Sequence, residues 1–242
     1  MRISSTIMLA SGAVALAGCN VSVGSDSGSA VERAFPVGGF TGIAVAGPYD
    51  GAVHTGAAPS VRARGGEDAL DRLQVEVEDG RLKITPKEHF SLFGWGFWRR
   101  HDEVSLTVTV PMLDRAALAG AGTISIDEVT GARFEGKVAG SGNLNLAVVD
   151  VGDLELAVAG SGDARAAGKA KSVRYKIAGA GDIHAADLTA EHADVASAGA
   201  GSVAGRATAT AQIKTAGAGD VTITGGAKCS VSKAGAGNVN CS

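Results

Sequence analysis

A Gly-(Ala/Ser)-Gly turn returns at a nearly constant interval through the second half of this 242-residue chain. Successive turns begin 18 to 20 residues apart, and a fixed period of this length is typical of a solenoid, in which each repeat packs on its neighbours. The first glycines of the seven turns are Gly120, Gly140, Gly160, Gly179, Gly199, Gly217 and Gly235. The spacing therefore predicts a stack of about seven short coils.

Within each repeat, apolar and polar residues alternate on both sides of the turn. The positions four and six residues after the first glycine are mostly apolar, as in Ile124 and Ile126, and the residue between them is usually polar, as in Ser125. This alternation predicts two strands in each coil, with one face turned inward. Alanine precedes all seven turns, which we interpret as a tightly packed corner. The expected fold is all-β, with a β-helix or solenoid over residues 114–242.

The preceding residues, 35–113, form a β-rich segment that we expect to continue or cap the solenoid. The run Leu73–Glu78 alternates strictly and leads through Asp79-Gly80 into a second alternating run at residues 81–85. This arrangement is a strong signal for a β-hairpin. Residues 67–73 leave room for one helical turn and no more.

The N-terminus has the pattern of a targeting peptide. Arg2 precedes an apolar stretch that is too short to cross a bilayer as a helix. The stretch ends in Leu16-Ala17-Gly18-Cys19, which resembles the lipobox of bacterial lipoproteins. That resemblance implies cleavage before Cys19 and diacylglycerol on its thiol. The alternative is an ordinary signal peptide that contains a cysteine.

The domain plan follows from this cleavage point. Residues 1–18 are predicted to be a lipoprotein signal peptide. Residues 19–34 are small and polar, which predicts a flexible tether between membrane and fold. Asn20 stands where, in the class that the lipobox resembles, an aspartate often retains lipoproteins at the inner membrane. The expected location is the cell envelope, at the outer membrane, on its periplasmic or surface face.

Two cysteines remain if Cys19 is acylated. Cys229 and Cys241 form an even pair in a chain expected to be exported, which predicts a disulfide. They lie six residues before and six residues after the first glycine of the last turn, so both are expected to face inward. A bond between them would close the last coil, where a solenoid otherwise exposes its core and its strand edges.

The residue after each Gly-x-Gly is Asn, Asp, Ser or Thr, and stacking would bring these side chains into a ladder. Asp and Asn oxygens suit calcium, but the same side chains also hydrogen-bond backbone N–H groups in tight turns. Only Asp163 and Asp182 are adjacent carboxylates, and we favour turn capping. The acidic residues and histidines near His184 and His192 show no recognised ligand spacing. We therefore predict no metal and no cofactor.

Half of the aromatic residues lie in one segment, residues 89–103, between two predicted strands. Trp and Arg are favoured at protein interfaces and in the lipid headgroup zone, so this loop is a candidate for binding a partner, a glycan or the membrane. The alternative is a flap that folds over the first coil as a hydrophobic cap. The partner-binding candidates are Phe90, Phe93, Trp95, Phe97, Trp98, Arg99 and Arg100.

Charge and motifs argue against nucleic-acid binding and against catalysis. Removal of the leader leaves 21 basic and 25 acidic side chains, and such a balance does not attract nucleic-acid phosphates. The stretch Gly131–Lys137 approaches a P-loop, but Val138 replaces the required Ser or Thr. Coils of 18 to 20 residues leave no room for the inserted loops that build a catalytic groove. We expect a protein that is not an enzyme.

The repeated AGSGN, AGSGD, AGAGD and AGAGN motifs, after a segment that opens Phe40-Thr41-Gly42-Ile43, resemble the GIN-domain family. That family is described as the "putative auto-transporter adhesin" head domain and has no established biochemical function. The resemblance covers residues 35–242 and implies an all-β, β-helix-like fold, with a homo-oligomer left open. We expect a lipid-anchored, structural or adhesive envelope protein with an envelope protein or glycan as partner. The alternative is a polysaccharide-binding or polysaccharide-acting β-helix protein.

Overall fold

Long parallel strands make up most of the computed structural model, which describes residues 30–87 and 103–242. Each strand from β9 to β13 bends at its middle, so its first half leaves one Gly-x-Gly turn and its second half leads into the next. The repeat strands are β9 (Thr123–Gly140), β10 (Asn143–Gly160), β11 (Asp163–Gly179), β12 (Ile183–Gly199), β13 (Val203–Gly217), β14 (Val221–Thr224), β15 (Lys228–Gly235) and β16 (Val239–Cys241).

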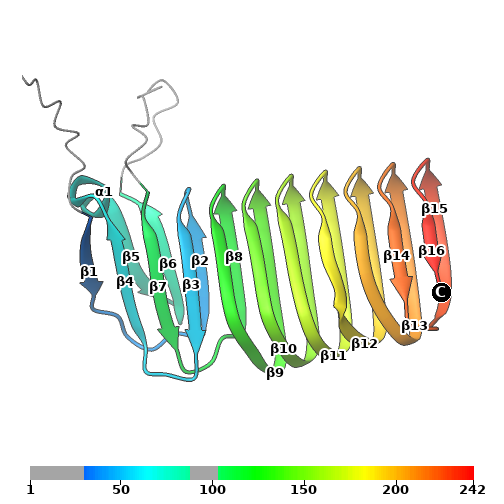
Figure 1. Cartoon of the computed structure of the whole chain (residues 1–242), viewed down its shortest axis with the longest axis horizontal. Coiled ribbons are helices and arrows are strands. Elements are labelled where there is room, and N and C mark those ends of the chain that lie inside the picture. Colours follow the sequence, from blue (N-terminus) through cyan, green and yellow to red (C-terminus); the bar gives the residue numbers. More distant parts are fainter. Residues whose placement is uncertain (1–29, 88–102) are drawn as a thin grey trace, which may run out of the picture.

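The coils stack along one axis with their turns aligned on one long edge of the molecule (Figure 1). Parallel pairing places Gly140 beside Gly160 and Gly160 beside Gly179, so the turns are in register from coil to coil. The prediction of an all-β solenoid is confirmed. The chain makes about six turns of the solenoid, so the predicted count of seven coils was approximate.

Two facing walls result from this winding. We call wall A the one that leads into the turns. It is formed by β5 (Leu73–Glu78), β6 (Arg81–Pro86), β2 (Gly42–Ala46), β8 (Arg115–Gly120), the second halves of β9 to β13, and β15. Wall B leaves the turns and contains β1 (Val31–Phe35), β4 (Ser60–Gly65), β7 (Ser105–Val110), β3 (Asp50–Thr55), the first halves of β9 to β13, β14 and β16. Inward side chains from both walls meet in one continuous apolar core.

The N-terminal part both continues and caps this stack. Strands β2 and β3 form a coil that pairs in parallel with β8 and β9, and β6 and β7 form the next coil outward. The order along the axis therefore differs from the order in the chain. The strands of these coils are β2 (Gly42–Ala46), β3 (Asp50–Thr55), β6 (Arg81–Pro86), β7 (Ser105–Val110) and β8 (Arg115–Gly120).

Antiparallel strands and a short helix cover the outer end. Strand β5 (Leu73–Glu78) pairs with β6 through the predicted hairpin, whose turn has positive φ at both Asp79 (51°) and Gly80 (71°). Helix α1 (Glu67–Asp71) confirms the expected single helical turn. Strand β4 (Ser60–Gly65) pairs with β7, and the edge strand β1 (Val31–Phe35) pairs with β4. Because β1 begins at Val31, the fold starts before the predicted end of the tether at residue 34.

The stack contains one turn of the repeat type that its sequence conceals. The chain passes from β2 to β3 through Gly47-Pro48-Tyr49, where tyrosine takes the place of the second glycine. Gly47 has φ of 131°, as the repeat glycines do, and its N–H donates to the carbonyl of Ala119 at 2.8 Å. The turn edge therefore extends one coil beyond the first Gly-x-Gly motif.

Glycine is required at the turn edge because the backbones of neighbouring coils approach closely there. The first glycines of the seven turns have φ between 118° and 137°, a range that L side chains rarely adopt. The second glycines face a carbonyl directly: a Cβ on Gly162 would lie 2.0 Å from the oxygen of Gly142. The carbonyl of Gly140 accepts from the N–H groups of Ser161 and Gly162 at 2.8 and 3.0 Å, which ties adjacent coils together.

Inward positions follow the predicted alternation, while the alanine before each turn does not lie where we expected it. Ile124, Ile126 and Phe134 are buried in the core, in the same coil. The alanines that precede the turns, Ala139 and Ala159 among them, are instead exposed on the outer side of wall A. The interpretation of a tightly packed corner was wrong, because these residues fall on the outward phase of the strand.

Replacement of Gly162 by alanine is expected to destabilise the fold by more than about 2 kcal/mol, since its Cβ would overlap a carbonyl that cannot move without breaking the stack. The matched control is Gly39→Ala, where a Cβ meets nothing within 4 Å. Chemical denaturation of both variants measures the difference. Equal stability of the two variants would contradict the role given to close stacking.

The two C-terminal cysteines face each other across the last coil and are paired. Cys229 in β15 and Cys241 in β16 lie in opposite walls of the last coil, with their Cα atoms 6.6 Å apart and their sulfurs joined. We predict that mass spectrometry without reduction will recover one linked peptide pair, whereas two free thiols would contradict the bond. A chain with both cysteines replaced by serine should unfold with about 3 kcal/mol less stability, because the closed loop restricts the unfolded chain.

Candidate partner-binding face

The outer side of wall A is hollowed by two shallow grooves that lie side by side across several coils. One groove, of about 540 Å³, follows the outward positions seven and five residues before each turn. The other, of about 590 Å³, follows the positions three and one residues before each turn. We call these four outward columns together the wall A face.

The first groove is polar. Side chains that can donate or accept hydrogen bonds lie along it in successive coils, and they include Ser172, His192, Thr210 and Gln212. His192 Nδ1 and Thr210 Oγ1 are 2.8 Å apart, in neighbouring coils. The second groove is lined mainly by alanines, and Lys176 and Lys214 also line it.

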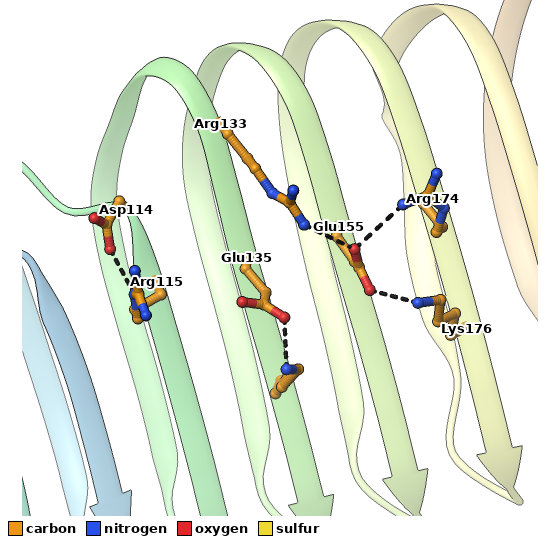
Figure 2. A network of polar contacts seen from close by, with 8 residues as sticks. Asp114, Arg115, Arg133, Glu135, Glu155, Arg174 and Lys176 are labelled. Atoms are coloured by element: carbon orange, nitrogen blue, oxygen red, sulfur yellow. Dashed lines mark hydrogen bonds and ion pairs between the residues drawn. The ribbon is translucent and has the colours of Figure 1, made fainter. Parts of the chain in front are cut away.

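A buried carboxylate organises the middle of the face (Figure 2). Glu155 is only 8% exposed and lies between cations from the coils on both sides. Its oxygens accept from Lys176 at 2.6 Å, from Arg133 at 3.2 Å and from Arg174 at 3.5 Å. Arg174 also reaches Asp194 at 3.7 Å in the following coil. The ion pairs therefore run along the stack and join four coils.

The cations keep Glu155 ionised. The hydrogen bond from Lys176 lowers the pKa of the carboxyl below its ordinary value of 4.5, against the opposing effect of burial, and the charges of Arg174 and Arg133 act in the same direction. A carboxylate with lowered pKa contributes its stabilisation above its ordinary pKa and loses it as the pH falls through the folded-state value. Three cations therefore share this one carboxylate.

Wall B uses its polar side chains differently. The ladder residues cap backbone N–H groups of the next coil: Asp163 Oδ1 accepts from Asp182 N at 3.1 Å, and Asp182 Oδ1 accepts from Ser202 N at 2.7 Å. Asp50, after the concealed turn, caps Thr123 in the same way at 2.7 Å. The turn-capping interpretation of the ladder thus holds at these positions.

One part of the ladder has the make-up of a metal cluster. Asp163, Asp182 and His184 offer ligand atoms within 4.8 Å of one another. One oxygen of each carboxylate already accepts a backbone N–H, and Arg165 forms an ion pair with Asp163 at 3.5 Å. A guanidinium beside the carboxylates opposes a divalent cation, so we assign the cluster to capping.

A second polar cluster joins β3 to β9. Asp127 accepts from Thr55 N at 3.0 Å and lies 3.0 Å from His54 Nδ1. Burial raises the pKa of Asp127, but the hydrogen bonds from Thr55 and His54 outweigh it and the pKa is lowered. The Thr55 hydroxyl lies 3.4 Å from Asp127 Oδ1 and 3.1 Å from the carbonyl oxygen of Glu128, so the cluster ties β3 to β9 and has the geometry of a structural joint.

Several predicted site residues lie outside the described part of the chain. The lipid-attachment residue Cys19 precedes residue 30, and the seven partner-binding candidates of the aromatic loop fall within residues 88–102. Strands β6 and β7, which flank that loop, lie beside the two strands that the concealed turn connects. Beyond β6 and β7, the end of the stack is covered by β4, β5 and α1.

No residue of the wall A face was predicted as a site residue. The signal for this face was nevertheless present in the sequence, since the outward columns can be read off the same register that identified the inward ones. The sequence did not indicate which wall binds a partner, because apolar and polar residues alternate in the same way on both walls. Only the structure shows that the polar side chains of wall B cap backbone N–H groups, whereas the outer side of wall A forms grooves.

Fold and face together define a class of protein: a β-solenoid of short, uninterrupted coils with a continuous outer surface. The chain belongs to the family described as "Putative auto-transporter adhesin, head GIN domain", whose model matches residues 39–227. No match was found among curated proteins. Among the described residues, no helix is both long and apolar enough to cross a membrane.

Solved structures share the fold. A putative adhesin from Bacteroides fragilis superposes with a TM-score of 0.79 at 23% identity, over 88% of this chain and 97% of that chain. A putative lipid binding protein from Parabacteroides distasonis gives 0.69 at 24% identity, over 89% and 97%. A putative adhesin from Parabacteroides merdae gives 0.69 at 16% identity, over 89% and 97%.

Replacement of Glu155 by glutamine is expected to lower stability at neutral pH by about 1 to 3 kcal/mol, because three cations lose their shared carboxylate. The difference from the unmodified protein should shrink below pH 4.5, where the native carboxylate is progressively protonated. Thermal unfolding across pH measures both effects. Glu191→Gln, at an exposed position, serves as the control. A stability difference between Glu155→Gln and the unmodified protein that stays constant with pH would contradict the role given to the ion pairs of Glu155.

Proposed function

We propose that this protein is a non-catalytic, adhesive or structural module of the cell envelope, held to the membrane by lipid on Cys19, that binds a partner through the wall A face. The observation that carries the proposal is the pair of parallel grooves on one side of an uninterrupted stack. Its membership of an adhesin head-domain family supports the same role. Membrane attachment is supported by the lipobox-like sequence that ends at Cys19.

The regular coils favour binding over catalysis. Aligned turns and bends leave the wall A face without inserted loops across the repeats, so groups on it are spaced along a straight surface rather than gathered around one reacting atom. Its central carboxylate, Glu155, is enclosed by three cations and is not free to act as a base. The polysaccharide-binding form of the alternative function fits this surface better than the polysaccharide-acting form.

The aromatic loop is proposed as a second contact. Its candidates, Trp95 and Trp98 among them, are joined to the stack through β6 and β7. The end of the stack is already covered by β4, β5 and α1, which removes the main reason for a further cap. Aromatic side chains next to arginines are common in binding hot spots.

The proposed role predicts capture of envelope material by the full chain immobilised on beads. Filling the alanine groove with the triple substitution A178Q/A198Q/A216Q should reduce capture severalfold, because longer side chains would occupy the space a partner needs. The measurement is the amount of envelope material retained.

In cells, Cys19→Ser should move the chain from the membrane fraction to the soluble fraction, since stable anchoring requires the acyl chains.

The matched control makes the same chemical change on the other wall. A147Q/A167Q/A186Q adds three glutamines to outward positions of wall B and should leave capture unchanged. Equal losses in both variants would mean that the substitutions act through stability, and the unfolding temperatures of the two would show it. Full capture by the groove-filled variant would overturn the assignment of the wall A face.

A further inference from the structure

The column of the wall A face that lies three residues before each turn contains only lysines and small residues. Parallel pairing sets Lys137 beside Ala157, Ala157 beside Lys176, Lys176 beside Ala196 and Ala196 beside Lys214. All three lysines are exposed. A lysine therefore projects from every second coil, and the coil between offers only a methyl group.

This alternation fixes the distance between the charges. Neighbouring strands lie about 4.8 Å apart, so lysines on every second coil are spaced by about 9.6 Å along the axis. The intervening alanines belong to the groove of about 590 Å³ that runs along this column. The result is a straight trough lined by Lys176 and Lys214, and Lys137 continues the same column beside Ala157 at its end.

Charge on the two walls is segregated. The wall A face has seven cations and four carboxylates over the seven coils that lead into the Gly-x-Gly turns. The cations are Arg115, Arg133, Lys137, Arg174, Lys176, Lys214 and Lys228, and the carboxylates are Glu135, Asp153, Glu155 and Asp194. The outward positions three, five and seven residues after the same turns carry two cations, Arg165 and Arg206, and four carboxylates, Asp127, Asp163, Asp182 and Asp220. The wall A face is thus positive although the chain as a whole carries −3.

The lysines differ in how far they are already neutralised. Lys137 pairs with Glu135, and Lys176 pairs with Glu155. In the next lysine-bearing coil, Gln212 takes the place of the carboxylate, and Lys214 forms no ion pair within the described residues. An anionic group bound at Lys214 therefore has no internal carboxylate to displace.

From these features we propose that the wall A face binds a linear acidic polysaccharide lying along the solenoid axis, with its acidic groups at Lys137, Lys176 and Lys214. The proposal rests on the proposed function and names its partner class. A spacing of about 9.6 Å is close to the length of one extended disaccharide, so a polymer with one acidic group in each disaccharide can meet every lysine. Exposed lysines attract carboxylates and sulfates alike.

The neighbouring groups favour a sugar polymer over other polyanions. Ser172, Thr210 and Gln212 in the polar groove can exchange hydrogen bonds with hydroxyl groups, and the alanine methyls offer a flat apolar surface to sugar rings. Among the described residues, no Phe, Tyr or Trp lines either groove, so these grooves lack the ring surfaces on which bases of single-stranded nucleic acid stack. Side-by-side packing of a second copy, wall A against wall B, is a competing outcome.

The test measures binding of the full chain in detergent to three immobilised polymers: hyaluronate, which has one carboxylate in each disaccharide, a neutral linear glucan and double-stranded DNA. Hyaluronate should bind best, and its binding should weaken as NaCl is raised, because salt screens exposed charges. The double variant K137Q/K214Q, which leaves the pairs of Glu155 intact, should bind about tenfold more weakly, since each exposed charge contributes a few-fold. Arg165→Gln combined with Arg206→Gln on wall B should leave binding unchanged.

Each other outcome overturns the proposal in a distinguishable way. Equal binding of the neutral glucan would show a ligand recognised without charge, and equal binding of DNA would show a general attraction to polyanions. Unchanged binding by K137Q/K214Q would place the site elsewhere, and concentration-dependent dimers with no polymer bound would assign the face to a second copy. In all of these cases envelope capture by the unmodified protein would still support the proposed function, whereas loss of capture alone would defeat that function.

Discussion

Close backbone contact at the turn edge governs the rest of this structure. Each first glycine has a left-handed conformation, and each second glycine faces the carbonyl of the coil before it at a distance that excludes any Cβ. The carbonyls of the first glycines accept hydrogen bonds from the following coil. Because the turns can stack in only one way, the register of every strand that leaves or enters them is set along the whole axis.

The fixed register determines where each residue of the repeat lies on the surface or in the core. Every position of the repeat becomes a column parallel to the axis, so a residue that recurs at one position forms a continuous stripe on the molecule. Inward columns give the core, and the Asx and Ser/Thr column gives the capping ladder on wall B. The same rule makes a periodic charge pattern on wall A out of side chains that are twenty or more residues apart in sequence.

The sequence predicts the parts of this fold that depend on local pattern. Period-two alternation identified buried residues such as Ile124, and Asp79-Gly80 identified the hairpin. The insertion of β2 and β3 between β7 and β8 along the axis could not be predicted, since it depends on pairing between strands distant in sequence. The burial of Glu155 could not be predicted from the sequence either, because it depends on cations that come from neighbouring coils.

The two walls differ in what their polar groups are free to do. On wall B, Asp163, Asp182 and Asp220 hold backbone N–H groups of the next coil, and replacing such a contact by a partner would leave a donor unpaired at the turn. On wall A, the polar contacts join side chain to side chain, so a bound acidic group can take over a lysine without exposing any backbone group. This difference in cost, together with the shape of the grooves, supports the proposal that a partner binds on wall A rather than on wall B.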